Sequence, residues 1–471
     1  MKKVGFFVYL AVFILSGCAL SPSMPDASKP VKHYADYNLH EKTLSNGLKV
    51  IVKEDHRAPV VVSQVWYKVG SSSEYNGITG VSHVLEHMMF KGTKKHAPGE
   101  FSKIIAENGG RENAFTGRDY TAYFQQLEKS RLPVSFELEA DRMRNVILLE
   151  EEFKKEIQVV MEERRMRTED NPHAQTYEQF SATAYVNSPY HAPIIGWMND
   201  LENMNVNDLQ KWYDAWYAPN NATVVVVGDV NADEVFELAE EHYGELKPSK
   251  IPEIKPRKEI RQKGTRRVTI KAPAQLPYMI MGYQAASIND TQESWEPYAL
   301  EVLAAVLDGG ISARLETNLI RKQQIAASVG AGYDAFTPGR ELFTFSGTPS
   351  KSHSVTDLEN AIRDQIKVVQ SELVSEKELA RVKAQVVAGK VYEKDSIFYQ
   401  AMSIGMLETT GMGWQLAEQF VDNIKQVTKE QVQAVANKYL IDDNLTVAVL
   451  DPQPIDPTQS RPRSAGGRHG G

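Results

Sequence analysis

The sequence predicts an α+β protein made of two units of similar size joined by a linker. The chain has 471 residues, and 42% of its residues are hydrophobic, which is enough for two or more cores. Strand-like and helix-like runs follow one another in a similar order in both halves, which favours an internal duplication. Residues 247–266 are rich in Lys, Arg and Pro and are the predicted linker. A long surface loop within one domain is the alternative for this stretch.

Residues 1–17 are predicted to be a signal peptide rather than part of the fold. Two lysines precede an apolar run, residues 4–15, which is too short to span a bilayer comfortably. The sequence Leu-Ser-Gly-Cys that ends at Cys18 resembles the bacterial lipoprotein signal. We therefore expect Cys18 to be lipidated and to become the mature N-terminus.

Both ends of the mature chain are expected to be irregular. Residues 18–36 contain Ser, Pro, Asp and Lys without periodicity and are predicted to form the lipidated N-terminus and a flexible tether. Residues 453–471 are rich in Pro, Arg and Gly and are predicted to be a disordered tail. Ala19 after the cysteine favours the outer membrane in the lipoprotein class. The expected location is the periplasmic side of a bacterial cell envelope.

The first unit, residues 37–246, is expected to form a Val-rich sheet with several helices. A turn at residues 116–119 separates two strand-like runs and predicts a hairpin. The expected elements are strands 49–53 and 60–69, a helix through 83–87, a helix from 98 to 110, hairpin strands 112–115 and 120–127, helices 133–146 and 150–168, and a strand at 223–230.

The second unit, residues 267–452, is expected to have a similar order of strands and helices. Its runs of β-branched and aromatic residues again alternate with helix-forming segments. The expected elements are strands 267–272 and 278–285, a long helix 293–307, strands 326–333 and 342–348, helices to about residue 439, and a final strand 445–450.

Residues 83–87 read His-Val-Leu-Glu-His and carry the strongest functional signal in the chain. On a helix, His83 and His87 stand one turn apart on one face, so both imidazoles can bind one metal ion. Glu86 lies beside them, where it can take a proton from an attacking water. The order H-x-x-E-H is a zinc-peptidase motif, and neutral imidazole suits zinc. A buried helix with two hydrogen-bonded histidines and a chance glutamate is the alternative.

A third ligand is expected from the helix predicted after residue 150. On a helical wheel Glu163 falls at the margin of the apolar face, whereas Glu162 points to solvent. Glu156 lies two turns before Glu163 on the same side, where it can orient a ligand. A solvated acidic helix is the alternative. Because a catalytic zinc keeps three protein ligands and a water, the sequence predicts one zinc per chain, held by the two histidines and Glu163.

These residues resemble the pitrilysin/insulinase/mitochondrial processing peptidase family of zinc peptidases. The likeness covers roughly residues 40–452 and extends beyond the ligands. Residues 44–48 look like the family's first strand, and residues 113–116 look like its active-site strand. Further matches are residues 86–93, 216–222, 228–229 and 309–315. The resemblance implies two homologous α/β-sandwich domains that form a clamshell, each a mixed, mainly antiparallel sheet with helices packed on one face.

The predicted activity is that of a zinc metalloendopeptidase acting on extended peptides or unfolded protein segments. Glu86 would serve as general base towards water and would then pass the proton to the leaving amine. The strand holding Asn113 and Ala114 is expected to add a substrate strand through main-chain hydrogen bonds. This mode reads the backbone, so broad specificity is expected.

One departure from the family bears on partners. Many active members carry, in the second domain, an arginine and a tyrosine that bind substrate. Here Arg321 occupies the arginine position, but Ala327 occupies the tyrosine position. In some bacterial relatives one subunit carries the zinc motif and a separate subunit carries the pair. The resemblance therefore implies either a homologous partner subunit that supplies the pair or a homodimer, with Arg321 a candidate for substrate binding.

Charge and composition limit the remaining choices. The net charge of −8 and the absence of a long basic run exclude nucleic acid as an expected partner. A non-catalytic peptide-binding or assembly scaffold of the same fold is one alternative to the peptidase. A periplasmic metal-binding lipoprotein is another, and a divalent ion other than zinc also stays open.

Overall fold

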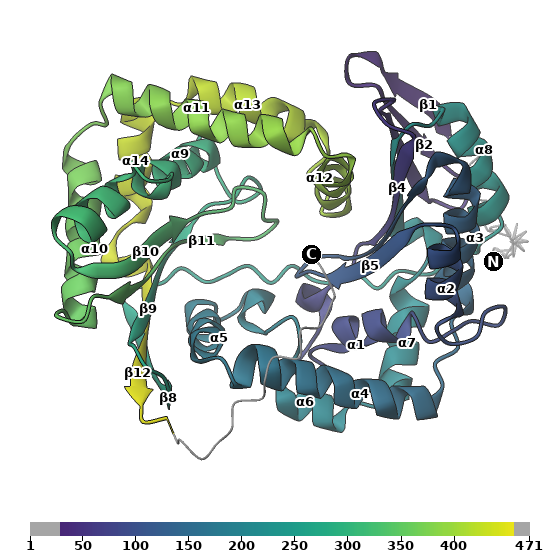
Figure 1. Ribbon diagram of the computed structural model, residues 1–471, viewed down its shortest axis with the longest axis horizontal. Coiled ribbons are helices and arrows are strands. Elements are labelled where there is room, and N and C mark those ends of the chain that lie inside the picture. Colours follow the sequence, from purple (N-terminus) through teal and green to yellow (C-terminus); the bar gives the residue numbers. More distant parts are fainter. Residues whose placement is uncertain (1–28, 456–471) are drawn as a thin grey trace, which may run out of the picture.

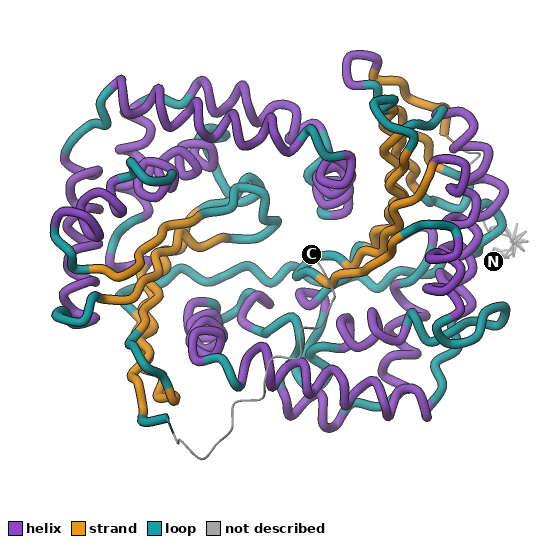
Figure 2. Tube along the Cα trace, in the orientation of Figure 1, coloured by secondary structure: helices purple, strands orange, loops and turns teal. Residues whose placement is uncertain are grey.

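The computed structural model describes residues 29–455 as two halves that face each other (Figure 1). The predicted signal peptide, Cys18 and residues 456–471 of the predicted tail lie outside the described residues. Each half has one sheet with its own helices on the outer face (Figure 2). The predicted α+β fold of two similar sandwiches is therefore confirmed. Within residues 29–455, no helix has both the length and the apolar character needed to cross a membrane.

The first half has a seven-stranded sheet in the order β1-β2-β3-β7-β4-β6-β5. Its elements are β1 (Lys29–Tyr34), β2 (Leu39–Thr43), β3 (Lys49–Glu54), β4 (Val60–Tyr67), α1 (Val81–Met88), α2 (Glu100–Glu107), β5 (Arg111–Thr116), β6 (Thr121–Glu128), α3 (Leu132–Asn145), α4 (Glu150–Arg164), the π-helical turn η4 (Arg165–Glu169), α5 (Pro172–Ala184), α6 (Met198–Asn203), α7 (Val206–Trp216), β7 (Ala222–Gly228) and α8 (Ala232–Tyr243).

The second half has a five-stranded sheet in the order β10-β11-β9-β12-β8. Its elements are β8 (Arg266–Pro273), β9 (Tyr278–Ala285), α9 (Glu296–Asp308), the π-helix η7 (Glu316–Lys322), β10 (Ala326–Gly332), β11 (Glu341–Pro349), α10 (Val355–Ser371), α11 (Glu376–Glu393), α12 (Ile397–Thr409), α13 (Gln415–Gln426), α14 (Lys429–Tyr439) and β12 (Leu445–Gln453).

The two sheets repeat one topology. Strands β3-β7-β4-β6-β5 of the first half match strands β8-β12-β9-β11-β10 of the second in chain order. Each set contains one parallel pair, β3 with β7 and β12 with β8, and its other pairs are antiparallel. The internal duplication is thus visible in strand order, although it is faint in the sequence.

In addition, one helix of each half packs on the inner face of the other half's sheet. Helix α12 of the second half packs on β4 and β7 of the first, where Trp66 lies in a small apolar core with Ile404. Helix α5 of the first half packs on β8, β9 and β12, where Phe180 meets Ile280. The helices of each half thus cover one face of its own sheet, as the resemblance implied, and a helix from the other half covers the second face.

Two local expectations are wrong. The tether predicted for residues 18–36 fails from Lys29 onward, because β1 pairs antiparallel with β2 and takes residues 29–34 into the first sheet. Residues 44–48, expected as a strand, form the turn between β2 and β3, where Leu44 N donates to Leu48 O at 2.9 Å. Gly47 in this turn has φ +91°, a conformation that glycine adopts at little cost.

The packing of α12 on the first sheet depends on a close approach between Gly405 and Trp66. A Cβ added there would lie 2.1 Å from Nε1 of the fully buried Trp66. We expect Gly405→Ala to lower the free energy of unfolding by about 1–3 kcal/mol, because overpacking forces the helix or the indole to shift. Denaturant unfolding of the purified chain measures this. Gly389→Ala is the matched control, since Gly389 of α11 is exposed and an added Cβ there meets nothing within 4 Å. An unchanged midpoint for Gly405→Ala would contradict tight seating of α12.

Candidate metal centre

The predicted histidine helix, α1, is short and is fixed at its amino end by two buried carboxylates. Glu74 accepts hydrogen bonds from Gly80 N at 2.7 Å and from Ser82 N at 2.9 Å. Asp200 accepts from Thr79 N at 3.1 Å and from the Thr79 hydroxyl at 2.6 Å. Glu74 thereby satisfies the Ser82 N–H, one of those that the start of a helix leaves unpaired, and Asp200 fixes the turn that precedes the helix. Burial raises the pKa of Glu74 to about 7 against its two main-chain hydrogen bonds.

The two histidines and Glu163 of α4 meet at one point. Their ligand atoms all lie within 4.8 Å of one another. Glu163 Oε2 lies 3.5 Å from His87 Nε2 and 3.9 Å from His83 Nε2. Zinc bonds of about 2.0–2.2 Å in a tetrahedron hold ligand atoms about 3.3–3.6 Å apart, so small side-chain rotations would close this set on one ion.

Helix periodicity correctly separated the two adjacent glutamates of α4. The Glu163 side chain is 14% exposed and faces the histidines, whereas the Glu162 side chain is 62% exposed and pairs with Arg165. The role of Glu163 as a metal ligand stays a prediction. Arg167 of η4 pairs with the other carboxylate oxygen of Glu163 at 2.5 Å, a partner that the sequence did not indicate.

The electrostatics of this point suit a cation. Burial and the neighbouring His87 lower the pKa of His83 to about 4, so its imidazole is neutral and can offer a lone pair. Burial disfavours the charged form of His87, but hydrogen bonds with Glu156 and Glu163 outweigh it and raise its pKa to about 9. The surrounding carboxylates thus stabilise positive charge here, as they would stabilise a divalent ion in place of the proton.

Glu156 lies where it can fix the orientation of His87. The His87 Nδ1–H donates to Glu156 Oε1 at 3.0 Å, which turns Nε2 towards Glu163. Lys91 binds the second oxygen of Glu156 at 2.6 Å and compensates its charge. A carboxylate behind a ligating imidazole is a recurring arrangement in zinc sites. The donor set and its supporting shell therefore fit zinc.

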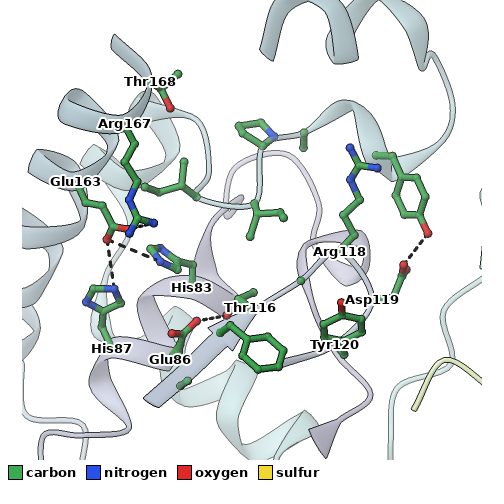
Figure 3. Close-up of a pocket in the computed structure, with 18 of the residues that line it drawn as sticks. His83, Glu86, His87, Thr116, Arg118, Asp119, Tyr120, Glu163, Arg167 and Thr168 are labelled. Atoms are coloured by element: carbon green, nitrogen blue, oxygen red, sulfur yellow. Dashed lines mark hydrogen bonds and ion pairs between the residues drawn. The ribbon is translucent and has the colours of Figure 1, made fainter. Parts of the chain in front are cut away.

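Glu86 links this centre to the edge of the first sheet. It accepts a hydrogen bond from the Thr116 hydroxyl at the end of β5 at 2.6 Å (Figure 3). Burial raises the pKa of Glu86 above its ordinary value against this hydrogen bond, which moves the carboxyl towards the range of a general base. In the sheet order β5 is an edge strand, paired with β6 alone among the described strands. Asn113 and Ala114 of this strand both line the adjoining cavity.

The cavity beside these residues has a volume of about 1600 Å³ and is lined by both halves. The first half supplies all the predicted metal and base residues. The second half supplies wall residues, namely Asp334, Phe336, Thr337, Pro338, Glu341, Met406 and Thr410. Arg321, the predicted substrate-binding arginine, is not among the lining residues. Arg321 lies in η7, its side chain is 52% exposed, and its guanidinium pairs with Glu316 at 3.0 Å. The loop after β10, rather than η7, forms this part of the cavity wall.

Family models match both parts of the chain. Residues 49–197 match the model described as "Insulinase (Peptidase family M16)", and this part holds the histidines and Glu163. Residues 203–386 match the model described as "Peptidase M16 inactive domain".

Relatives and solved structures that are similar to this chain are also named as proteases. "Zinc protease PqqE" of Helicobacter pylori is 40% identical over 61% of this chain and 65% of its own length. An "Uncharacterized zinc protease" of Rickettsia felis is 26% identical over 89% of this chain and 98% of its own length. The crystal structure of a protease from Helicobacter pylori has a TM-score of 0.83 and 31% identity over 88% of this chain and 99% of that one. The periplasmic protease PqqL from Escherichia coli shares the fold, with a TM-score of 0.74 and 19% identity over 92% of this chain and 50% of that one. The chain belongs to the M16 (pitrilysin/insulinase) family of zinc peptidases.

Proposed function

We propose that this chain is a zinc-dependent metalloendopeptidase that hydrolyses extended peptides or unfolded protein segments. The observation that carries the proposal is the convergence of His83, His87 and Glu163 within 4.8 Å beside the buried Glu86. Three nitrogen and oxygen ligands that face an open cavity are typical of catalytic rather than structural zinc. The family supports zinc as the ion, and the one candidate ligand group among residues 29–455 supports a single ion per chain.

Different side chains of this chain would bind the metal ion, orient a ligand and transfer the proton. The two histidines and Glu163 would hold the ion, and Glu156 would keep His87 in the tautomer that offers Nε2. Zinc in such a site polarises a carbonyl and lowers the pKa of water to about 7. Glu86 would take a proton from the attacking water and deliver it to the leaving amine nitrogen. Its hydrogen bond with Thr116 keeps the carboxylate beside β5, where a substrate strand would lie.

The free edge of β5 is the proposed substrate-binding element. An extended peptide can add to such an edge through main-chain hydrogen bonds. Asn113 and Ala114 line the cavity at this edge and would contact the peptide. Main-chain pairing is independent of side chains, so we expect broad specificity for unfolded segments.

A partner subunit is part of the proposal. The position of Arg321 outside the cavity lining and the alanine at position 327 support a homologous partner, or a second copy, that completes substrate binding. Peptide hydrolysis at ordinary rates by the isolated monomer would remove this need.

We also propose anchoring through a lipid on Cys18, at the periplasmic side of the outer membrane. The lipoprotein-like signal before Cys18 supports it, and the periplasmic protease PqqL of Escherichia coli has the same fold. Expressed in a bacterial host, the chain should sediment with membranes, and Cys18→Ser should abolish this sedimentation. Equal membrane association of both forms would contradict the anchor.

Replacement of the proposed base gives the first test. Glu86→Gln should lower kcat for a quenched, unstructured peptide by about 10²- to 10⁴-fold, because the general base is lost. Bound zinc, measured by elemental analysis, should stay at one per chain, since Glu86 is not a ligand. Glu151→Gln, an exposed change on α4, is the matched control. Zinc-loaded wild type without Glu86-dependent hydrolysis, alone and with partner subunits, would favour the non-catalytic scaffold.

Replacement of Glu156 tests the support of the metal ligand. Glu156→Gln should weaken zinc affinity by about 10- to 100-fold, because the neutral amide no longer orients and polarises His87. Competition with a chromogenic chelator measures this, with Glu151→Gln as the control. A zinc affinity equal to that of the wild type would contradict this role and leave Glu156 only as the ion-pair partner of Lys91.

Removal of zinc by a stronger chelator should abolish hydrolysis, and added zinc should restore it.

A further inference from the structure

A second charged feature of the cavity lies away from the metal centre. Arg118 lies in the turn between β5 and β6, and it lines the same cavity as His83 and Glu86. Figure 3 shows it on the opposite side of the cavity from His87 and Glu163. The proposed mechanism makes no use of this guanidinium.

Arg118 is half-buried but has no ion-pair partner. No carboxylate of residues 29–455 lies within ion-pair distance of it, and its polar contact is a long one, Nη2 to the Tyr177 hydroxyl at 3.5 Å. Arg167, the other arginine of the cavity, is by contrast paired with Glu163 at 2.5 Å. A guanidinium has five N–H donors, so most of those on Arg118 are left for a ligand.

The neighbouring groups hold Arg118 in place without neutralising it. Asp119 accepts from the Tyr190 hydroxyl at 2.6 Å and from the Ser72 hydroxyl at 2.8 Å. This fixes the Tyr190 ring, and the guanidinium stacks 4.8 Å from its centre. Glu341, the other nearby carboxylate, accepts from a threonine hydroxyl and from its own neighbour's N–H. The site is therefore preorganised around one unpaired positive charge.

The planar fork of arginine matches a carboxylate, which it binds through two parallel hydrogen bonds. Arg118 follows Thr116, the partner of Glu86, by two residues, and two residues of chain span at most about 7 Å. A group bound by Arg118 thus lies within a few residues of a peptide bond placed at Glu86. Carboxylates otherwise outnumber lysines and arginines in the cavity lining, so an acidic group elsewhere would be repelled.

We propose that Arg118 forms a carboxylate-binding subsite that selects peptides with an acidic side chain, or a free C-terminal carboxylate, at one fixed position near the cleaved bond. This inference rests on the proposed function and deepens it. It assigns Arg118 a part in specificity rather than in the chemical step.

Peptide binding to the zinc-loaded Glu86→Gln chain tests the subsite without catalysis. The probes are fluorescein-labelled peptides in which one Glu is moved along a neutral sequence, each matched by a Gln peptide and each made as C-terminal acid and amide. One position should bind about tenfold more tightly as the carboxylate than as the amide, the order expected of a charge-assisted pair. Adding Arg118→Gln should bring this ratio to about one, and Arg118→Lys should keep part of it. Arg131→Gln, the same charge change at an exposed arginine outside the cavity lining, should keep it all.

The arms identify the source of the carboxylate. A preference that follows the Glu position assigns the subsite to an acidic side chain, whereas one that follows the free terminus assigns it to the C-terminal carboxylate. The inference is overturned if wild-type Arg118 gives no preference at any position, or if Arg118→Gln leaves the preference intact. Because the chain used for binding is inactive by design, the binding result does not depend on hydrolysis. Failure of hydrolysis by the wild type, both alone and with partner subunits, would reject the peptidase proposal and leave the binding result interpretable.

Discussion

Helix α1 is held at its amino end by hydrogen bonds to two buried carboxylates, and the candidate site takes its geometry from this helix. Seven of its eight residues are buried, and the exception, His87, turns towards the cavity. With its start fixed by Glu74 and Asp200, the helix cannot rotate without breaking hydrogen bonds of buried groups, and each buried group left unsatisfied costs about 1–3 kcal/mol. The stripe of histidines therefore faces α4, whose own two-turn spacing delivers Glu156 and Glu163 together. Asp200 lies in α6, 121 positions after Thr79, so this precision requires α6 to be packed at the start of α1.

Helix and strand periodicity explain what the sequence could predict. The i, i+4 histidines, the inward Glu163 and the valine-rich strands follow from short-range patterns that survive folding. The carboxylates at the start of α1 could not be predicted, because they act across loops and leave no periodic signal. The strand β1 was missed because its mixed, polar composition resembles a linker and its pairing with β2 is what orders it. The unpaired state of Arg118 depends on where Asp119 and Glu341 place their oxygens, which only the folded chain determines.

The two halves divide the work of the site unequally. The first contributes every proposed ligand, the proposed base and the strand edge, whereas the second closes the cavity with a loop after β10 and part of α12. This division agrees with the matched family descriptions, in which only the second is an "inactive domain". The duplicated fold thus has the same strand order in both copies, whereas the candidate metal-binding residues are gathered in one, within the residues that the structure describes.

The exchange of α5 and α12 has a consequence for how the chain is made. The inner face of the first sheet stays bare until residues 397–409 have been synthesised, more than 300 positions after Trp66. Contacts between residues so far apart in the sequence form slowly. Until they form, the uncovered apolar face of the sheet can aggregate with other chains. During synthesis the unfinished chain therefore presents an apolar surface of the kind that chaperones bind. A premature stop before α12 would leave every proposed metal ligand present, but on a fragment that is prone to aggregate.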